Sequence, residues 1–334
     1  MKKTMIAALL LLIAVGASAQ CETSEGGTAS VKIYRAVKPL LEGKFSVSNV
    51  GTDTAYVHFA KGNLKYQAST KTWDFHEHQY DNFGESEGNE TPTANRATQS
   101  KWIDLFGCCT SGWSGSGAVE YQPWATSTRP SDYGPPAGYS AVGEYAYCDW
   151  GRSFYAGYRL LTAAEWIYII YTRRNHANLR GAGTLFGKHG VFFLPDGWDW
   201  NHLPDALAAA VTNYDADESD DKPATGFSWT PVTGTKHNMS NVSYSSNVIA
   251  NNTSGNTLWN LLETAGVVFL PSGGYRVGED VTYNDGLHYW TSTADGSSWY
   301  LFYFRASSSD AFDTPKSISQ RHYGRSVRLV KEVE

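Results

Sequence analysis

Residues 286–331 read GLHYWTSTADGSSWYLFYFRASSSDAFDTPKSISQRHYGRSVRLVK, and this stretch predicts the closing strands of a β-rich domain. Positions 289–293 combine aromatic and β-branched residues, which favours a strand. Positions 299–304 alternate large aromatic side chains between the two faces of a second strand. A last strand is predicted at 326–330, with Val327 pointing into the core. The rest of the chain is interpreted around these three strands.

The strand at 299–304 carries large side chains on both faces. One face, with Phe302 and Phe304, is predicted to fill a core. The other face, with Trp299 and Tyr303, either packs on a second layer or forms an exposed aromatic surface, and the alternation favours neither. Exposed aromatic residues beside Ser and Asp are typical of binding surfaces. The predicted ligand contacts are Asp295, Ser298, Trp299, Leu301, Tyr303, Arg305, Asp313, Gln320, His322 and Tyr323. Three residues of the closing motif are predicted to be scaffold: Gly324, Arg325 and Arg328.

The motifs Y-W-T-S-T at 289–293 and R-H-Y-G-R-S-V-R-L-V at 321–330 resemble the C-terminal end of the major paralogous domain family of Fibrobacter and Bacteroides-type bacteria. The segments F-S-V-S at 45–48 and V-H-F-A-K-G-N-L-K-Y-Q at 57–67 resemble its opening strands, so the resemblance covers residues 43–331. That family is related to the formylglycine-generating-enzyme-like branch of the C-type lectin fold. The resemblance implies a loop-rich α+β domain with short mixed sheets and two main helices. Variable proteins of diversity-generating retroelements end in similar segments, which present hypervariable ligand-binding positions.

The first helix is predicted at 163–174. Thr162 and Glu165 have the spacing of a capping box, and apolar residues from Trp166 onward form a buried stripe. Arg173 and Arg174 suit the negative end of the helix dipole. The preceding segment, Y-R-L-L-T-A-A-E-W at 158–166, resembles the R-L-P-T-E-A-E-W signature of formylglycine-generating enzymes, and an internal ion pair between Arg159 and Glu165 is predicted there.

A second helix is predicted at 258–265, where Leu258, Leu261 and Leu262 point inward and Gly266 ends the helix. Two segments echo each other, G-V-F-F-L-P at 190–195 and G-V-V-F-L-P at 266–271. The similarity predicts that each segment is a strand that ends in a proline turn. Both strands are expected in the same sheet system.

The N-terminus predicts export. Lys2 and Lys3 precede an apolar run that is too short to span a bilayer, and Ala17-Ser18-Ala19 follows it. Residues 1–19 are therefore expected to be a signal peptide, followed by a tether at 20–42 with one short strand at 31–34. One domain is expected at 43–331, and no transmembrane segment is expected after removal of the signal peptide. A lipoprotein anchored through Cys21 is the alternative to simple secretion. The chain has 27 basic and 33 acidic residues and no basic cluster, which argues against a nucleic-acid partner.

Metal-binding patterns are incomplete. His76 and His78 flank Glu77, yet no third ligand has a suitable spacing, so a polar surface is expected there. The acidic run at 215–221 lacks the sixth-position Gly and twelfth-position Glu of a calcium loop, so a solvated loop is expected and an opportunistic calcium site stays open. No cofactor is expected.

The four cysteines are Cys21, Cys108, Cys109 and Cys148. In an oxidising compartment, Cys108 or Cys109 is expected to bridge to Cys148, which leaves the third cysteine reduced or paired with Cys21. No cysteine follows Cys148, whereas the resemblance to formylglycine-generating enzymes would require a copper-binding pair there. The C-type lectin sugar motifs are also missing, since Gln122-Pro123-Trp124 and Tyr283-Asn284-Asp285 do not match them.

These observations predict a non-enzymatic protein of the cell envelope or surface that binds a protein or glycan ligand. Two alternatives remain open. One is a formylglycine-generating-enzyme-like enzyme. The other is a structural subunit of a surface appendage, which an unpaired edge strand near the N-terminus would favour.

Overall fold

The computed structural model describes residues 18–23, 29–34, 40–50, 53–67, 69–70, 72–84, 89, 100–108, 128–129, 133, 150–151, 157–218, 225–232, 244–283, 286–295, 298–304, 317–318 and 321–333. The chain divides into two compact units, Met1–Pro39 and Leu40–Glu334. In the first unit, β1 (Ser18–Thr23) pairs antiparallel with β2 (Ala29–Tyr34). The short strand predicted within the tether is confirmed as β2.

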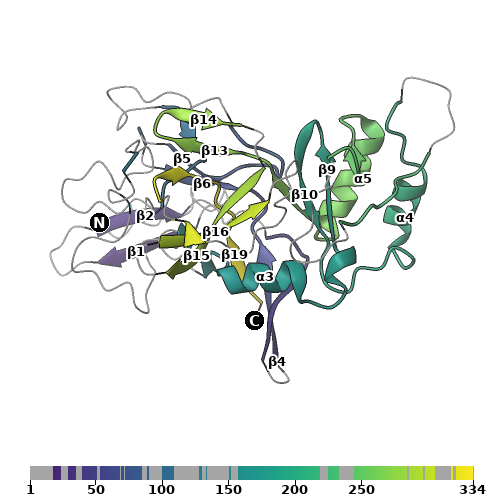
Figure 1. Cartoon of the computed structure of the whole chain (residues 1–334), viewed down its shortest axis with the longest axis horizontal. Coiled ribbons are helices and arrows are strands. Elements are labelled where there is room, and N and C mark those ends of the chain that lie inside the picture. Colours follow the sequence, from purple (N-terminus) through teal and green to yellow (C-terminus); the bar gives the residue numbers. More distant parts are fainter. Residues whose placement is uncertain are drawn as a thin grey trace, which may run out of the picture. The chain divides into compact units, whose positions relative to one another are not determined.

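The larger unit is an α+β structure of short sheets and helices, as the sequence predicts (Figure 1). Its strands in the first half are β3 (Phe45–Val50), β4 (Asp53–Phe59), β5 (Leu64–Gln67), β6 (Thr72–Phe75), β7 (Trp102–Ile103), β8 (Tyr158–Arg159), β9 (Arg180–Leu185) and β10 (Lys188–Phe193). Those in the second half are β11 (Val248–Ile249), β12 (Val268–Pro271), β13 (Tyr275–Val277), β14 (Asp280–Thr282), β15 (Leu287–Asp295), β16 (Ser298–Phe304), β17 (Ser317–Ile318), β18 (Tyr323–Gly324) and β19 (Val330–Glu332). The helices are α3 (Ala163–Tyr171), η4 (His176–Asn178), α4 (Asp205–Thr212) and α5 (Thr253–Thr264).

The strands of the larger unit form five sheets within the described residues. Their orders are β3-β4-β19-β8, β6-β5-β7, β11-β9-β10-β12, β14-β13-β18 and β15-β16-β17. The first sheet joins the two ends of the unit, because β19 pairs antiparallel with both β4 and β8. The β3–β4 hairpin projects beyond the other strands of this sheet (Figure 1).

The predicted last strand at 326–330 is misplaced. Val327 and Leu329 are fully buried, as expected, but they lie in extended chain without ladder pairing, and the strand β19 begins only at Val330. Inward alternation does not distinguish a paired strand from an extended segment whose side chains are buried. The strands predicted at 289–293 and 299–304 are confirmed as β15 and β16.

Helix α3 begins as predicted. Thr162 accepts a hydrogen bond from the Glu165 backbone nitrogen, and the Glu165 carboxylate accepts one from the Thr162 backbone nitrogen, which completes the capping box. Arg159 pairs with Glu165 at 2.7 Å, so the predicted ion pair is confirmed. The helix ends at Tyr171, three residues before the predicted end.

Helix α5 is confirmed, although it begins five residues earlier than predicted, where Asn252 caps it by accepting from the Gly255 nitrogen. Gly266 ends it with a φ of 89°. A Cβ at Gly266 would lie 2.1 Å from the Gly43 nitrogen, so only glycine fits this turn. The expectation of two main helices is wrong, because α4 is a third; Leu207 is its one buried residue, so its apolar stripe is short.

The two echoing segments are neighbours in one sheet, as predicted. Strand β10 pairs antiparallel with β12, and Phe192 lies opposite Phe269. These two phenylalanines pack with Trp259 of α5 in one of the buried clusters. In the part of the chain that the structure describes, no helix is both long and apolar enough to cross a membrane.

Arg328 links several segments of the larger unit from within its core. It is 1% exposed, and its Nε donates to Asn63 Oδ1 at 2.8 Å. Its two Nη groups donate to the backbone carbonyls of Ala60, Lys61, Gln79 and Phe269. Burial lowers the pKa of Arg328 to about 10. Gly324 and Arg325 are also buried, so all three residues are scaffold, as predicted.

Candidate functional site

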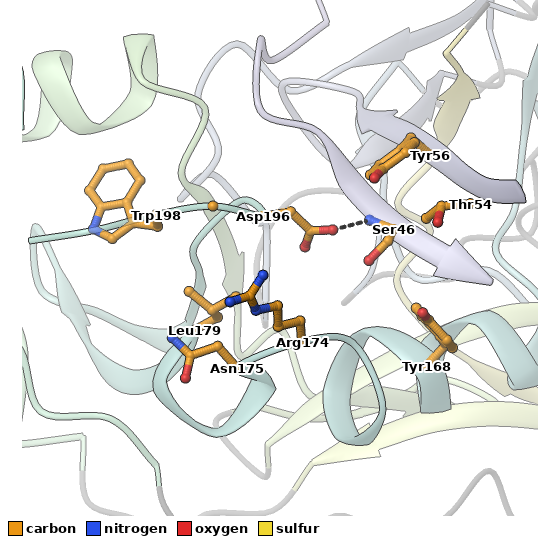
Figure 2. Close-up of a pocket in the computed structure, with 10 residues that line it drawn as sticks. Ser46, Thr54, Tyr56, Tyr168, Arg174, Asn175, Leu179, Asp196 and Trp198 are labelled. Carbon is orange, nitrogen blue, oxygen red and sulfur yellow. Dashed lines mark hydrogen bonds between the residues drawn. The ribbon is translucent and has the colours of Figure 1, made fainter. Parts of the chain in front are cut away.

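A pocket of about 710 Å³ opens between the β3–β4 hairpin, the end of α3 and the turn that follows β10 (Figure 2). The volume lies within the range of small-molecule sites, about 300–1,000 Å³. Its lining residues are Ser46, Thr54, Tyr56, Tyr168, Arg174, Asn175, Leu179, Asp196, Gly197 and Trp198. Four separate chain segments therefore build one site.

The hairpin contributes one face to the pocket. Alternation along β4 places Thr54 and Tyr56 on the same side, and Ser46 of β3 lies directly opposite Tyr56 in the ladder. The opposite face of β4 carries the buried Val57 and Phe59, which fix the hairpin against the core. Tyr56 is therefore held in place by its strand while the residue stays 37% exposed.

The end of α3 contributes Tyr168 and the residues after the helix. Arg173 turns back into the core, where its Nε donates to Ile169 O at 2.9 Å and caps a last-turn carbonyl. Arg180 caps the neighbouring carbonyl, Ile170 O. Arg174, the next residue after Arg173, is exposed, and Figure 2 shows its side chain extending toward the Asp196 side of the pocket.

The third wall is the turn after β10. The Trp198 nitrogen donates to Pro195 O, and Gly197 between them has a φ of 76°. A residue with positive φ at this place of a turn favours glycine. The turn directs Asp196 toward β3 and places the half-buried Trp198 ring at the pocket edge (Figure 2).

Asp196 is held by two donors. Arg173 Nη1 donates to Asp196 Oδ1 at 2.8 Å, and the Ser46 nitrogen donates to Asp196 Oδ2 at 3.0 Å. The Arg173 side chain is 0% exposed, and burial lowers its pKa while the Asp196 charge opposes that shift. The Asp196 carboxylate is therefore held in a fixed position in the pocket wall. Its negative charge is balanced by the buried Arg173.

Other polar groups of the pocket have no partner among the described residues. The Arg174 guanidinium and the hydroxyls of Tyr56 and Tyr168 make no hydrogen bond or ion pair to any residue that the structure describes. The Trp198 Nε1 also lacks an acceptor within this set, but it is buried and is not accessible to a ligand. Donors and acceptors on rigid elements, with no internal partner, can bind an external ligand.

The predicted contact residues of the C-terminal stretch are only partly described. Strands β15 and β16 contain Asp295, Ser298, Trp299, Leu301 and Tyr303. The ladder places Asp295 opposite Ser298. Three further predicted contacts lie outside the described residues: Arg305, Asp313 and Gln320. Whether these side chains share one exposed surface therefore stays a prediction.

The last two predicted contacts, His322 and Tyr323, are half-buried neighbours. Tyr323 stacks on Tyr275 with ring centroids 5.4 Å apart, and Arg325 lies 5.0 Å from the centre of the Tyr323 ring. Burial lowers the pKa of His322, and the charge of Arg325 adds to this shift. Neither residue lines the pocket.

The histidines of the incomplete metal motif have internal partners. His76 is buried and lies 3.0 Å from Asp104, so the expectation of polar surface is wrong for this residue; His78 pairs with Asp81. Across the described ranges, no group of three or more His, Cys, Asp or Glu side chains could hold a metal ion.

The acidic run at 215–221 is described only as far as Glu218, whose carboxylate accepts hydrogen bonds from the Thr253 and Ser254 nitrogens at the start of α5. This part of the run therefore stabilises a helix N-terminus. Cys108 is buried, which raises the pKa of its thiol, and the side chains of Cys21, Cys109 and Cys148 lie outside the described residues. The disulfide stays a prediction.

Comparisons with family models, with curated proteins and with solved structures give no match for this chain. The resemblance of the closing motif to a C-type-lectin-like family therefore stays a prediction, beside an α+β architecture that the structure shows directly.

Proposed function

We propose that this protein is a non-enzymatic binding protein of the cell envelope or surface, and that it holds a saccharide unit in the pocket between β3–β4, α3 and the turn after β10. The observation that carries the proposal is the set of unpartnered polar groups in this pocket. Tyr56, Tyr168 and Arg174 present donors toward one space, and no described residue satisfies them.

The chemistry of the lining favours a hydroxyl-rich ligand. Leu179 is the one aliphatic side chain among the lining residues, and the remainder are polar, aromatic or glycine. An apolar ligand would bury these polar groups without partners, at a cost of about 1–3 kcal/mol each. A sugar offers hydroxyls to the polar groups and carbon–hydrogen faces to the rings of Tyr56, Tyr168 and Trp198, and the two tyrosine hydroxyls can also hydrogen-bond.

A C-type-lectin-like scaffold is part of the proposal, and it rests on the resemblance of the closing motif. Secretion through the N-terminal leader would bring the pocket to the outside of the cell, where glycans are displayed. The C-terminal contacts from Asp295 to Tyr323 are retained as a second proposed surface. They could contact a larger ligand in addition to the pocket.

One observation bears on the appendage alternative. Strand β3 is an edge strand of its sheet, and such an edge could pair with another subunit. The turn after β10 already occupies part of this edge, because Asp196 accepts from the Ser46 nitrogen and donates from its own nitrogen to Lys44 O. The partly occupied edge of β3 is therefore better suited to form a wall of the pocket than to pair with another subunit.

The test compares two matched variants on an immobilised panel of cell-surface glycans. Tyr56 and Val248 are the large apolar residues of the described set that are more than a third exposed, at 37% and 39%. Tyr56→Ser should abolish retention on the glycans that the unaltered protein binds, whereas Val248→Ser, outside the pocket, should leave retention unchanged. Equal retention by both variants would remove the pocket from the proposal.

A further inference from the structure

The formal charges around the pocket do not cancel. Arg174 and Asp196 are the lining residues with formal charges at neutral pH. The Asp196 carboxylate is matched by the buried Arg173 at 2.8 Å. Arg174 lines the same space and has no carboxylate within ion-pair distance among the described residues. The pocket therefore retains one positive charge.

Other residues already perform the structural role that an arginine directly after a helix usually has. A cation after a helix commonly binds the last carbonyls and the negative end of the dipole. In α3 these carbonyls are bound by Arg173, through Ile169 O, and by Arg180, through Ile170 O. Arg174 makes neither bond, and its side chain extends toward the pocket instead (Figure 2). The helix does not require its charge.

The net charge of the chain does not favour anions. The whole chain carries a net charge of −6, so it has no general attraction for anions. Selection of an anion would therefore be a local property of this pocket.

We propose that the pocket selects an acidic saccharide, whose carboxylate pairs with Arg174 and whose ring lies among Tyr56, Tyr168 and Trp198. A planar guanidinium can donate two parallel hydrogen bonds to a planar carboxylate. One cation matches one carboxylate, whereas a doubly charged phosphate would leave a negative charge unmatched. This inference rests on the proposed saccharide function and adds the class of saccharide to it.

Three pairs of sugars that differ only in the carboxylate provide the test: glucuronate with glucose, galacturonate with galactose and mannuronate with mannose. Binding to the full secreted chain is measured by ligand-observed NMR, with acetate as a competitor. At least one uronate should bind about tenfold or more tightly than its neutral partner, which corresponds to one charged hydrogen-bonded contact. Acetate should compete only weakly, because it lacks the ring.

Arg174→Gln should reduce this preference to about onefold while the melting temperature stays unchanged, since Arg174 has no described partner to lose. Lys44→Gln is the matched control. Lys44 is an exposed cation directly before β3, and it does not line the pocket. It should keep the preference. Equal loss in both variants would show a long-range charge effect and overturn the inference.

Failures of the two proposals give different results. If neutral sugars bind as tightly as uronates, and Tyr56→Ser still abolishes binding, the saccharide pocket stands and the selection by Arg174 is wrong. If acetate competes as strongly as the uronates, the pocket is an anion site without sugar selectivity, and the inference is also wrong. If no sugar of either kind binds, both proposals fail together.

Discussion

The fully buried Arg173 side chain donates to Asp196 across 2.8 Å and so connects the end of α3 to the turn after β10. The same carboxylate receives the Ser46 nitrogen, so a single side chain fixes the distance between three walls of the pocket. The pocket depends on this pair for its shape.

Asp196→Ala should destabilise the protein, because it leaves the Arg173 charge buried without its partner. Breaking a buried pair costs about 3–5 kcal/mol, and the lower end, about 3 kcal/mol, is expected because Asp196 is a quarter exposed. Urea unfolding measures the loss. Asp199→Ala is the control, since among the described residues the Asp199 side chain bonds only to Asn201 and His202 of its own exposed turn. Equal stability of the two variants would show that the Arg173 pair does not support the pocket.

Val327→Asp should place an unpaired charge in the buried cluster that also contains Trp290 and Leu329, where Val327 is 0% exposed. A cost of several kcal/mol, of order 3–5, is expected from the uncompensated polar burial. Val248→Asp, at a valine that is 39% exposed, should change little. Thermal unfolding of both variants checks this, and a melting point for Val327→Asp within a degree or two of the unaltered protein would contradict the burial.

The local parts of the fold could be predicted from sequence. The capping box of α3, the Arg159–Glu165 pair and the strands β15 and β16 depend on spacings within a few residues. The predicted position of the last strand was wrong. Alternating buried side chains around Val327 give the same sequence pattern whether or not the segment pairs in a sheet.

The pocket was not predicted, because its walls lie up to about 150 positions apart in sequence, as Ser46 and Asp196 do. One signal was available. Arg173 and Arg174 form a doublet at a helix end, where a single arginine is sufficient to bind the last carbonyl. Arg174, which the helix end does not need, is therefore the sequence signal for this pocket.

The stability of the protein should depend on His322 below neutral pH. Burial and Arg325 lower its pKa in the folded state below the ordinary value of 6.5, so the unfolded chain binds the proton more readily. The stabilisation is present above pH 6.5 and is lost as the pH falls through that value and below. Denaturant midpoints between pH 7.5 and 5 should therefore fall more steeply in the unaltered protein than in His322→Gln. An identical pH dependence of the denaturant midpoint in the two proteins would show that His322 is not shielded from solvent in this way.

The alternation at 299–304 predicts opposite roles for neighbouring residues of β16. Trp299→Ala and Tyr303→Ala should fold normally and weaken attachment to a larger ligand, because the sequence places them on a contact face. Phe302→Ala and Phe304→Ala should each cost about 3–5 kcal/mol of stability, as truncations of core aromatics do. Unfolding curves and cell-surface retention separate the two sets. If all four variants lose only stability, then β16 is a core strand on both faces and the proposed C-terminal surface is wrong.

The location of a bound saccharide distinguishes the pocket from the C-terminal surface. A crystal structure of the protein with the tightest-binding sugar of the panel should show the ligand in the pocket, within hydrogen-bond distance of Arg174 and Tyr168 and against the Trp198 ring. A ligand bound instead along β15 and β16, with the pocket empty, would show that the pocket is not the saccharide site.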